Sequence, residues 1–294
     1  MDDREWLAES FEAHRTHLRS VAYRMLGSLS EADDAVQEAW LRASRTDTSG
    51  VENLGGWLST VVARVCLNML QSRKSRREEP LEFHLPDPIV SRADPTDPEA
   101  EAIMADSVGL ALLVVLETLA PAERLAFVLH DVFALPFEEI ATVVGRSPAA
   151  ARQLASRARR RVQSAAVPNA DLDRQREVVN AFLAASRAGD FEALLAVLDP
   201  DVVVRSDGGA LLPNLSRVLQ GARTVAGQAL AAAGLGLSVQ PARVNGAAGI
   251  VSWDAEGRPF AVMGFIVAGG RIVEIDILVD PERLSRLNLD ALMG

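Results

Sequence analysis

The stretch FEEIATVVGRSPAAARQLASRARRRV, residues 137–162, decides the fold of the middle of this chain. Its first part has apolar residues at helical spacing, namely Ile140, Val143 and Val144. Gly145 permits a sharp turn, and Ser147 followed by Pro148 is typical of the N-cap and first residue of a second helix. Two short helices joined in this way are the arrangement of a DNA-binding helix-turn-helix.

The second of these helices has two distinct faces. Its apolar face carries Ala151, Leu154, Ala158 and Val162. Arginine can bind guanine edges or phosphates, and glutamine can bind adenine, so the polar face suits a DNA groove. The predicted DNA contacts are Arg146, Arg152, Gln153, Ser156, Arg157 and Arg160. A plain helical hairpin with an arginine-rich face is the alternative explanation.

The charge distribution supports a nucleic-acid partner, although the net charge of −10 by itself argues against one. Residues 55–77 contain five basic residues and no acid, and residues 146–165 contain six arginines and no acid. A solvated helix face normally mixes the two signs, so both segments are candidates for DNA binding.

Length and composition indicate a multidomain globular protein. A chain of 294 residues is long enough for several cores. The longest apolar run, 108–116, is too short to span a bilayer, and the N-terminus lacks a secretory pattern, so we expect a cytoplasmic protein. The single cysteine, Cys66, excludes an internal disulfide framework and a cysteine-rich zinc site. No metal or cofactor is expected.

Residues 1–79 are predicted to form a helical bundle. Apolar residues recur at helical spacing in two runs that Gly27 separates, and Ser30 with Asp33 resembles a helix start. A loop over 47–56, rich in small polar residues, then precedes a third helix that runs through Arg77.

Residues 80–105 are predicted to be a linker. Five prolines and many acids between Glu78 and Glu99 disfavour helix and sheet alike. Helical periodicity returns over 106–165, which gives a second all-α domain containing the helix-turn-helix.

Residues 170–294 are predicted to form an α+β domain. Two helices, 174–188 and 191–198, precede Val- and Ile-rich runs at 202–204, 237–244, 250–253, 259–267 and 272–279. Ala268-Gly269-Gly270 is a hairpin signal between the last two runs, so we expect an antiparallel sheet.

A polar face in the first domain suits a protein partner. Asp34, Gln37, Glu38 and Leu41 share one side of the predicted helix 34–43 and combine charge with one apolar anchor. Glu38 and Arg42 can equally form a routine intrahelical pair, worth about 0.2–0.5 kcal/mol.

Together with the segment GWLSTVVARVCLN, residues 56–68, and the basic residues that follow it, these features make residues ~10–163 resemble the extracytoplasmic-function group of sigma factors. The resemblance implies docking of residues 34–43 on the clamp coiled coil of core RNA polymerase, with the flap as a further contact. It implies that residues 47–53 and 57–77 read the −10 promoter element and residues 136–162 the −35 element.

The residues assigned to the −10 element combine a basic surface for the strand with a pocket for an unstacked base. They are Asn53, Trp57, Arg64, Asn68, Arg73, Lys74, Arg76 and Arg77. Base stacking on Trp57 would contribute about 1–3 kcal/mol. The alternative role of Trp57 is a core anchor for its helix.

Residues 170–294 resemble a SnoaL-like domain, a conical α+β fold that a subgroup of these sigma factors carries. The resemblance rests on short motifs: Leu85-Pro86-Asp87-Pro88 in the linker, Asp207-Gly208-Gly209, and Asp280-Pro281-Glu282-Arg283-Leu284. His84 stands where the family has Trp, Ala210-Leu211 replace Gly-Lys, and Asp280 and Arg283 replace Asn and Lys. The resemblance implies that the extension packs on the linker and on the promoter-binding domain, and that it regulates activity in cis, in place of a separate anti-sigma protein.

Two alternatives remain at this stage. A ligand-responsive helix-turn-helix regulator would explain residues 109–294, but not the docking helix or the first basic segment. A SnoaL-type enzyme would need an acid or base, yet residues 170–294 contain no His, Tyr or Cys, which leaves Asp207, Asp254 and Asp276. A small ligand of the cone is a further expected partner. We expect an initiation factor rather than an enzyme.

Overall fold

The computed structural model describes residues 3–48, 50–51, 53–75, 84–92, 109–163, 171–287, 289 and 292. The chain forms two compact units. The first comprises Met1–Glu78 and Leu112–Ala165, and the second comprises Glu79–Ala111 and Ala166–Gly294. Among the described residues, no helix has the length and apolar character needed to cross a bilayer.

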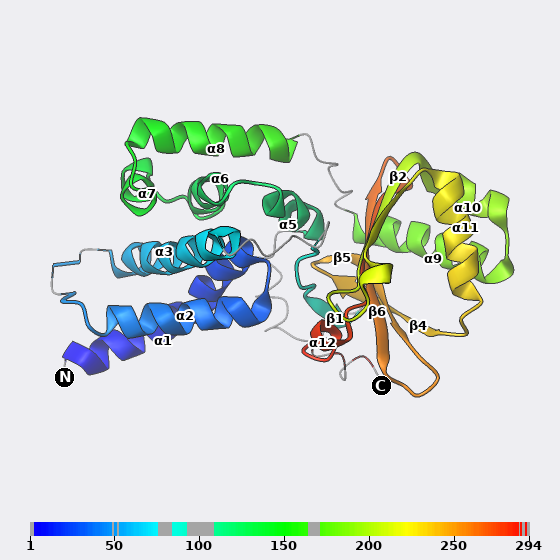
Figure 1. Ribbon diagram of the computed structural model, residues 1–294, viewed down its shortest axis with the longest axis horizontal. Coiled ribbons are helices and arrows are strands. Elements are labelled where there is room, and N and C mark those ends of the chain that lie inside the picture. The colour runs from blue at the N-terminus through cyan, green and yellow to red at the C-terminus, as the bar shows by residue number, and fades with distance from the viewer. Residues whose placement is uncertain are drawn as a thin grey trace. The chain divides into compact units, whose positions relative to one another are not determined.

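The described part of the first unit is helical (Figure 1). Its elements, with α5 beginning in the second unit, are α1 Asp3–Leu26, α2 Leu29–Ala43, α3 Leu54–Ser75, α5 Leu110–Glu117, α6 Pro121–Phe127, the π-helical turn η1 Val128–Val132, α7 Phe137–Val144 and α8 Pro148–Gln163. The predicted apolar stripe of α1 forms the core, with Phe11, Leu18, Val21, Met25 and Leu26 at most 1% exposed.

The N-cap of α2 lies two residues before the predicted one. Gly27 has a φ of +70°, which a glycine adopts without strain. Ser28, rather than Ser30, is the N-cap of α2, and its hydroxyl accepts a hydrogen bond from the Glu31 amide. The predicted start at Ser30 is therefore wrong, because the helix begins as soon as the left-handed glycine has turned the chain.

The helix-turn-helix is formed as predicted. Gly145 closes α7 in the left-handed region, with a φ of +63°. The Ser147 hydroxyl accepts a hydrogen bond from the Ala150 amide at 3.3 Å, which caps α8 in front of Pro148. Ile140 and Ala141 of α7 are buried against neighbouring helices.

The second unit is a helix-and-sheet domain. Its strands are β1 Val90–Arg92, β2 Leu198–Asp207, β3 Arg217–Gln220, β4 Ser238–Val244, β5 Ala247–Trp253, β6 Pro259–Ala268 and β7 Arg271–Leu278. Its helices are α9 Leu172–Ala188, α10 Phe191–Val197, the 3-10 turn η2 Pro213–Leu215, α11 Ala222–Ala233 and α12 Pro281–Leu284.

The described strands form one sheet in the order β1-β4-β5-β6-β7-β2-β3. The predicted hairpin joins β6 to β7, and Gly269 and Gly270 have φ values of +58° and +80°. The expected antiparallel pairing holds for the described strand pairs except one, because β2 pairs with β7 in parallel. No tight turn connects these two strands, so a hairpin does not fix their relative direction.

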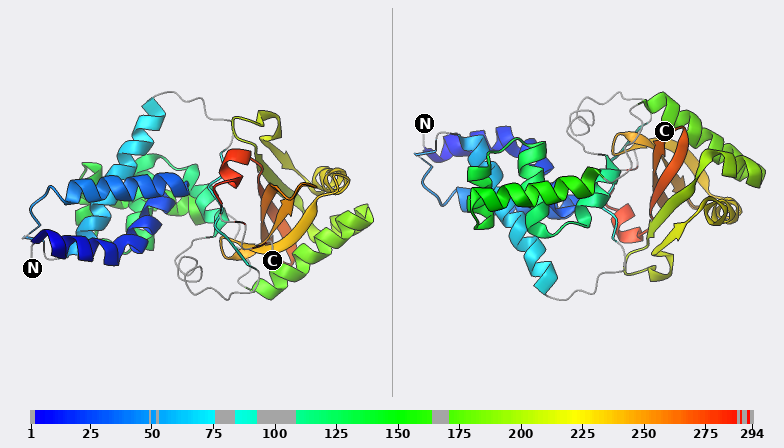
Figure 2. Two further views of the ribbon diagram at one scale, coloured as in Figure 1. Left: turned by 90° about the horizontal axis from the view of Figure 1, so that it is seen from below. Right: turned by 90° about the horizontal axis from the view of Figure 1, so that it is seen from above.

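The two faces of this sheet have different coverings. α9, α10 and α11 lie on one face, where they enclose a core that includes Phe182, Ile250, Phe265 and Ile275 (Figure 2). α12 lies on the other side of the sheet. Because side chains alternate along a strand, Glu274 and Asp276 face away from the helices when Ile275 faces them.

The linker contributes to the sheet, which corrects the expectation that it resists all regular structure. Val90–Arg92 forms β1 and pairs antiparallel with β4. None of the five prolines lies within this strand, so the backbone of the strand itself can donate its hydrogen bonds. The predicted linker residues 80–83 and 93–105 lie outside the described residues.

Candidate DNA-binding and linker-binding sites

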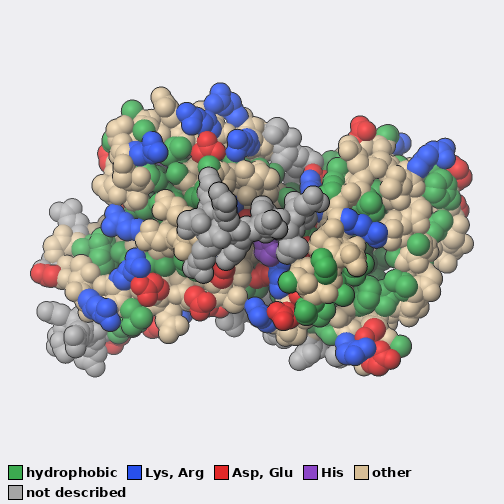
Figure 3. All heavy atoms as spheres, in the orientation of Figure 1, with side chains coloured by type: hydrophobic (Ala, Val, Ile, Leu, Met, Phe, Trp, Pro, Cys, Tyr) green, Lys and Arg blue, Asp and Glu red, His purple; other side chains and the backbone are tan. Residues whose placement is uncertain are grey.

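The polar face of α8 is an exposed arginine-rich surface. The predicted contacts on it, Arg152, Gln153, Ser156, Arg157 and Arg160, are all exposed, as is Arg146 in the preceding turn. Arg and Lys side chains gather over α8 in Figure 3. Ala151, Ala155 and Ala158 are buried on the opposite face, so packing holds the helix while its arginines stay available.

Several of these arginines contact acids in the same unit. Arg152 lies 3.2 Å from Glu138 and stacks over the Phe137 ring, and Arg157 lies 3.8 Å from Glu123. The pair of Arg152 with Glu138 is exposed and contributes about 0–1 kcal/mol, so a DNA phosphate can replace this acid. The Glu123 side chain is 11% exposed, so its pair with Arg157 is partly buried.

α3 carries the residues predicted to read the −10 element. Trp57 is half-buried, whereas Arg64 and Asn68 are exposed. Asn53 accepts a hydrogen bond from the Gly56 amide at 3.0 Å and thereby caps α3. Arg73 forms an ion pair with Glu31 of α2. The side chain of Lys74, together with Arg76 and Arg77, lies outside the described residues.

The predicted docking face of α2 is solvent-accessible. Asp34, Gln37 and Leu41 are exposed, and Leu41 is 43% exposed, which leaves an apolar side chain available to a partner. Glu38 pairs with Arg42 at 2.8 Å, so the routine intrahelical pair is present. The opposite face, with Ala35, Val36 and Ala39, is buried.

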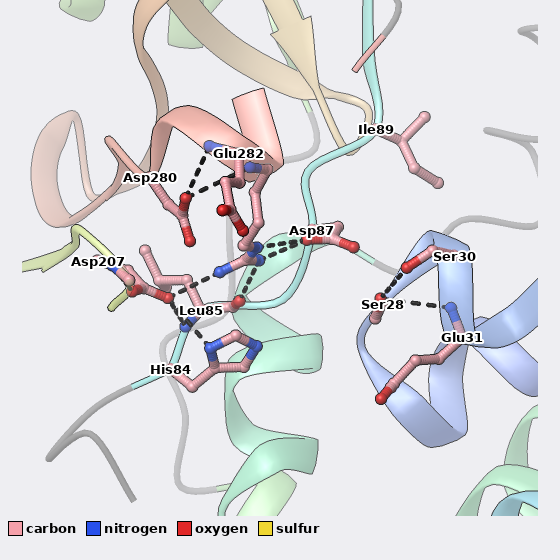
Figure 4. Close-up of polar contacts among 12 residues, drawn as sticks. Ser28, Ser30, Glu31, His84, Leu85, Asp87, Ile89, Asp207, Asp280 and Glu282 are labelled. Atoms are coloured by element: carbon pink, nitrogen blue, oxygen red, sulfur yellow. Dashed lines mark hydrogen bonds and ion pairs between the residues drawn. The ribbon is translucent and has the colours of Figure 1, made fainter. Parts of the chain in front are cut away.

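In the second unit, Arg283 of α12 joins the linker to the sheet through three donated hydrogen bonds. Figure 4 shows the residues that accept them, Asp87, Asp207 and Leu85. Its Nε donates to the Asp87 carboxylate at 2.7 Å and its Nη1 donates to Asp207 Oδ2 at 2.8 Å. Its Nη2 donates to the Leu85 carbonyl oxygen at 2.6 Å. All three motifs singled out in the sequence therefore meet at one guanidinium group. We call Arg283, Asp87, Asp207 and the Leu85 backbone the linker latch.

Asp207 is the buried member of the linker latch, with its side chain fully shielded from solvent. Its Oδ2 accepts from the Leu85 amide at 2.8 Å, and its Oδ1 accepts from the Gly209 amide at 3.0 Å. Burial alone raises the pKa of this carboxyl, but the hydrogen bonds from His84, Leu85 and Gly209 outweigh it and lower the pKa to about 2. Asp207 is thus a permanent anion facing the linker.

Asp280 positions Arg283 by capping α12. Its Oδ1 accepts from the Glu282 amide at 2.9 Å and from the Arg283 amide at 3.4 Å. A Cβ at Gly209 would lie 2.0 Å from Asp280 Oδ2, so the chain can approach this closely only with glycine. The Asp207-Gly208-Gly209 motif is therefore both a turn and a docking site for α12.

The neighbouring motif residues support this geometry. A Cβ at Gly208 would lie 2.1 Å from the Leu212 carbonyl oxygen, so this glycine is also required. Pro281 occupies the first turn of α12, and Leu284 is 2% exposed. Pro86 and Pro88 of the linker are buried.

Sequence reasoning missed Asn245, which lies in the turn between β4 and β5 and binds the linker at Ile89. Its side-chain oxygen accepts a hydrogen bond from the Ile89 backbone amide at 3.1 Å, and its backbone amide donates to the Ile89 carbonyl oxygen at 2.8 Å. Asn245 has a φ of +48° before Gly246, and the Asn-Gly pair is a recognisable turn signal. The turn could have been predicted from this pair, but its bonds to the linker could not.

The other two carboxylates considered for catalysis lie away from the helix-facing core. Asp254 binds Arg258 within the turn between β5 and β6. Asp276 is 2% exposed on the opposite sheet face, 3.3 Å from Arg205, and burial raises its pKa to about 7. Neither residue points into the core that the helices cover.

Comparison with known proteins identifies two family regions in the helical part of the chain. The family Sigma-70 region 2 matches residues 10–76, and Sigma-70, region 4 matches residues 109–162. The ECF RNA polymerase sigma factor SigJ of Mycobacterium tuberculosis strain ATCC 25618 / H37Rv is 46% identical over 217 residues, which cover 73% of this chain and 69% of SigJ. The probable ECF sigma factor SigI of the same strain is 35% identical over 99% of both chains.

The fold of the whole chain also has a counterpart. The crystal structure of M. tuberculosis SigJ superposes with a TM-score of 0.73 at 35% identity, covering 96% of this chain and 99% of that one. Regions 2 and 4 in this order define a sigma-70-type transcription initiation factor, not an enzyme. The chain belongs to the extracytoplasmic-function RNA polymerase sigma factors. The match to the SigJ structure includes the C-terminal helix-and-sheet unit, because it covers 96% of this chain.

Proposed function

We propose that three surfaces of this sigma factor bind three different partners. The exposed face of α8 reads the −35 element, α3 and the turn before it read the −10 element, and the exposed face of α2 docks on the clamp coiled coil of core RNA polymerase. The flap of the polymerase is the second contact. These roles place the protein in the cytoplasm with the polymerase and the promoter. The arginine-rich face of α8 is the observation that carries the assignment.

The assignment of α8 predicts a large effect of a double substitution. Replacing Arg157 and Arg160 by alanine should lower promoter affinity at least about tenfold, because each arginine contact contributes about 1–3 kcal/mol. The slope of log affinity against log salt should fall by about 2 if both contacts are to phosphates. The measurement is anisotropy titration of the holoenzyme on a promoter fragment that it has selected from a random library.

Gln163→Ala is the matched control, because Gln163 is exposed at the end of the same helix and outside the predicted contact set. Unchanged affinity and salt dependence in the Arg157→Ala/Arg160→Ala protein would refute the assignment of α8.

We further propose that the C-terminal unit regulates initiation in cis through the linker latch. Roughly 34 residues separate α3 from α5, and a free chain of that length reaches roughly 110–120 Å. When residues 84–92 are pinned on the sheet, about eight residues, with a reach of roughly 30 Å, connect α3 to the pinned segment. The linker latch thus limits how far α3 can move from the sheet. The three hydrogen bonds that the Arg283 guanidinium donates carry this proposal.

A small ligand of the cone is a separate proposal, supported only by the fold type. The helix-facing core consists of apolar side chains such as Phe182 and Phe265, so such a ligand would be apolar. The thermal midpoint of the full chain should rise with ligand concentration if an apolar compound binds there.

A further inference from the structure

A pocket opens in the C-terminal unit where the pairing between β2 and β7 shifts register. Leu198 of β2 pairs with Ile272 of β7, and the next pair is Val203 with Glu274, so four residues of β2 face one residue of β7. The pocket has a volume of about 450 Å³, which is within the range of small-molecule sites. Its lining includes Leu195, Leu198, Pro200, Arg223, Thr224 and Arg271.

The pocket is positively charged. Arg223 and Arg271 line it, and no acid does. Both side chains are exposed, and within the part of the chain that the structure describes neither of them forms an ion pair. In a chain with a net charge of −10, two cations in one pocket without an acid favour an anionic ligand. The planar fork of a guanidinium group matches the two oxygens of a carboxylate.

Two helices that pack side by side, α10 and α11, contribute further groups to the lining (Figure 1). Leu195 belongs to α10, and residues 221–224 are the N-cap and first turn of α11. No side chain caps α11 at Gly221. Because the first amides of an α-helix have no acceptor within it, the amides of residues 222–224 can add to the donors that the two arginines provide.

The remaining walls of the pocket are apolar. Leu195 and Pro200 lie on its surface, and Leu198 is fully buried beneath it. A ligand that fills this space therefore needs an apolar body as well as a negative charge. Phe182 and Phe265 of the helix-facing core do not line the pocket, so it is distinct from a site inside that core.

We propose that this pocket binds a small amphipathic carboxylate, whose charged group is held by Arg223 and Arg271 and whose apolar body lies against Leu195 and Pro200. The inference does not depend on the promoter assignments. It also differs from the ligand proposed for the helix-facing core, which would meet only apolar side chains. β2 begins at this pocket and ends at Asp207 of the linker latch, so the ligand would bind the strand that holds the linker.

Titration calorimetry of the full chain with matched probes tests the class of ligand. Octanoate and phenylacetate carry both a carboxylate and an apolar body, whereas octanol lacks the charge and inorganic phosphate lacks the apolar body. At least one carboxylate should bind saturably, and octanol and phosphate should bind at least about tenfold more weakly. No saturable binding of either carboxylate, or phosphate binding as tightly as they do, would overturn the proposal. Octanol binding as tightly as octanoate would also overturn it and would favour the apolar ligand of the core instead.

Substitutions locate the site. Arg223→Met and Arg271→Met should each weaken binding of the tighter carboxylate about tenfold, because each removes hydrogen bonds to a charged group. Both arginines are exposed, so the thermal midpoint of the ligand-free protein should change little in either variant. Arg258→Met is the matched control, since Arg258 is exposed in the turn between β5 and β6 and does not line the pocket.

Amide exchange gives a readout that does not depend on affinity. The amides of residues 222–224 should exchange more slowly when the carboxylate is bound, because they acquire an acceptor. Unchanged affinity in both the Arg223→Met and Arg271→Met proteins, or unchanged exchange of these amides in the saturated parent protein, would contradict the proposal.

Discussion

Replacing Arg283 by methionine should destabilise the C-terminal unit by about 3–5 kcal/mol. The substitution keeps an apolar stem of similar length but removes the only cation seen to bind both Asp87 and Asp207 among the described residues. Asp207 is fully shielded, so its charge would remain buried without this partner.

The measurement combines urea unfolding with amide exchange of residues 84–92. The Leu85 and Ile89 amides donate to Asp207 and Asn245, so they should be protected in the parent protein. In the Arg283→Met protein their exchange should accelerate sharply. Arg258→Met is the matched control, because that arginine forms exposed pairs within a surface turn. Equal stability and exchange in both variants would show that the linker latch contributes nothing.

Adding a methyl group at Gly209 is expected to disrupt the contact between this turn and Asp280 of the α12 cap. Gly209→Ala places Cβ 2.0 Å from Asp280 Oδ2 at a φ of +60°, so the α12 cap must shift. We expect a loss of at least about 3 kcal/mol, from backbone strain plus overpacking.

Gly257→Ala separates the two causes of this loss. Gly257 has a φ of +76°, but a Cβ there would have no neighbour within 4 Å. Its substitution should therefore cost only about 1 kcal/mol of backbone strain. The difference between the two variants in urea unfolding measures the clash with Asp280, and a difference near zero would mean that α12 is not held against Gly209.

Local signals predicted much of this structure. Gly145, Ser147 and Pro148 act within one turn of the chain, so their pattern alone defines the helix-turn-helix. The Gly269-Gly270 hairpin was predictable for the same reason. α11 was missed because its Ala-rich sequence, interrupted by Gly227, has neither a clear apolar stripe nor a capping side chain.

The linker latch was predictable only in part. The three motifs were recognised by resemblance, but Arg283 pairs with Asp87 across 196 residues and with Asp207 across 76. No local periodicity encodes such a pairing, which the fold alone brings about. The same is true of Arg124, whose bond to Met25 spans 99 residues and which sequence reasoning did not single out.

We propose that this sigma factor carries its own regulator, which acts through the linker latch. The most direct measurement is run-off transcription by core RNA polymerase from the selected promoter, with the full chain, a chain ending at residue 170, and the Arg283→Met chain. We predict a promoter-specific transcript with the full chain. We also predict that Arg283→Met changes the yield at least about threefold, in the same direction as truncation, while Arg258→Met leaves it unchanged. No transcript from any chain, or an Arg283→Met yield equal to that of the full chain, would contradict the account.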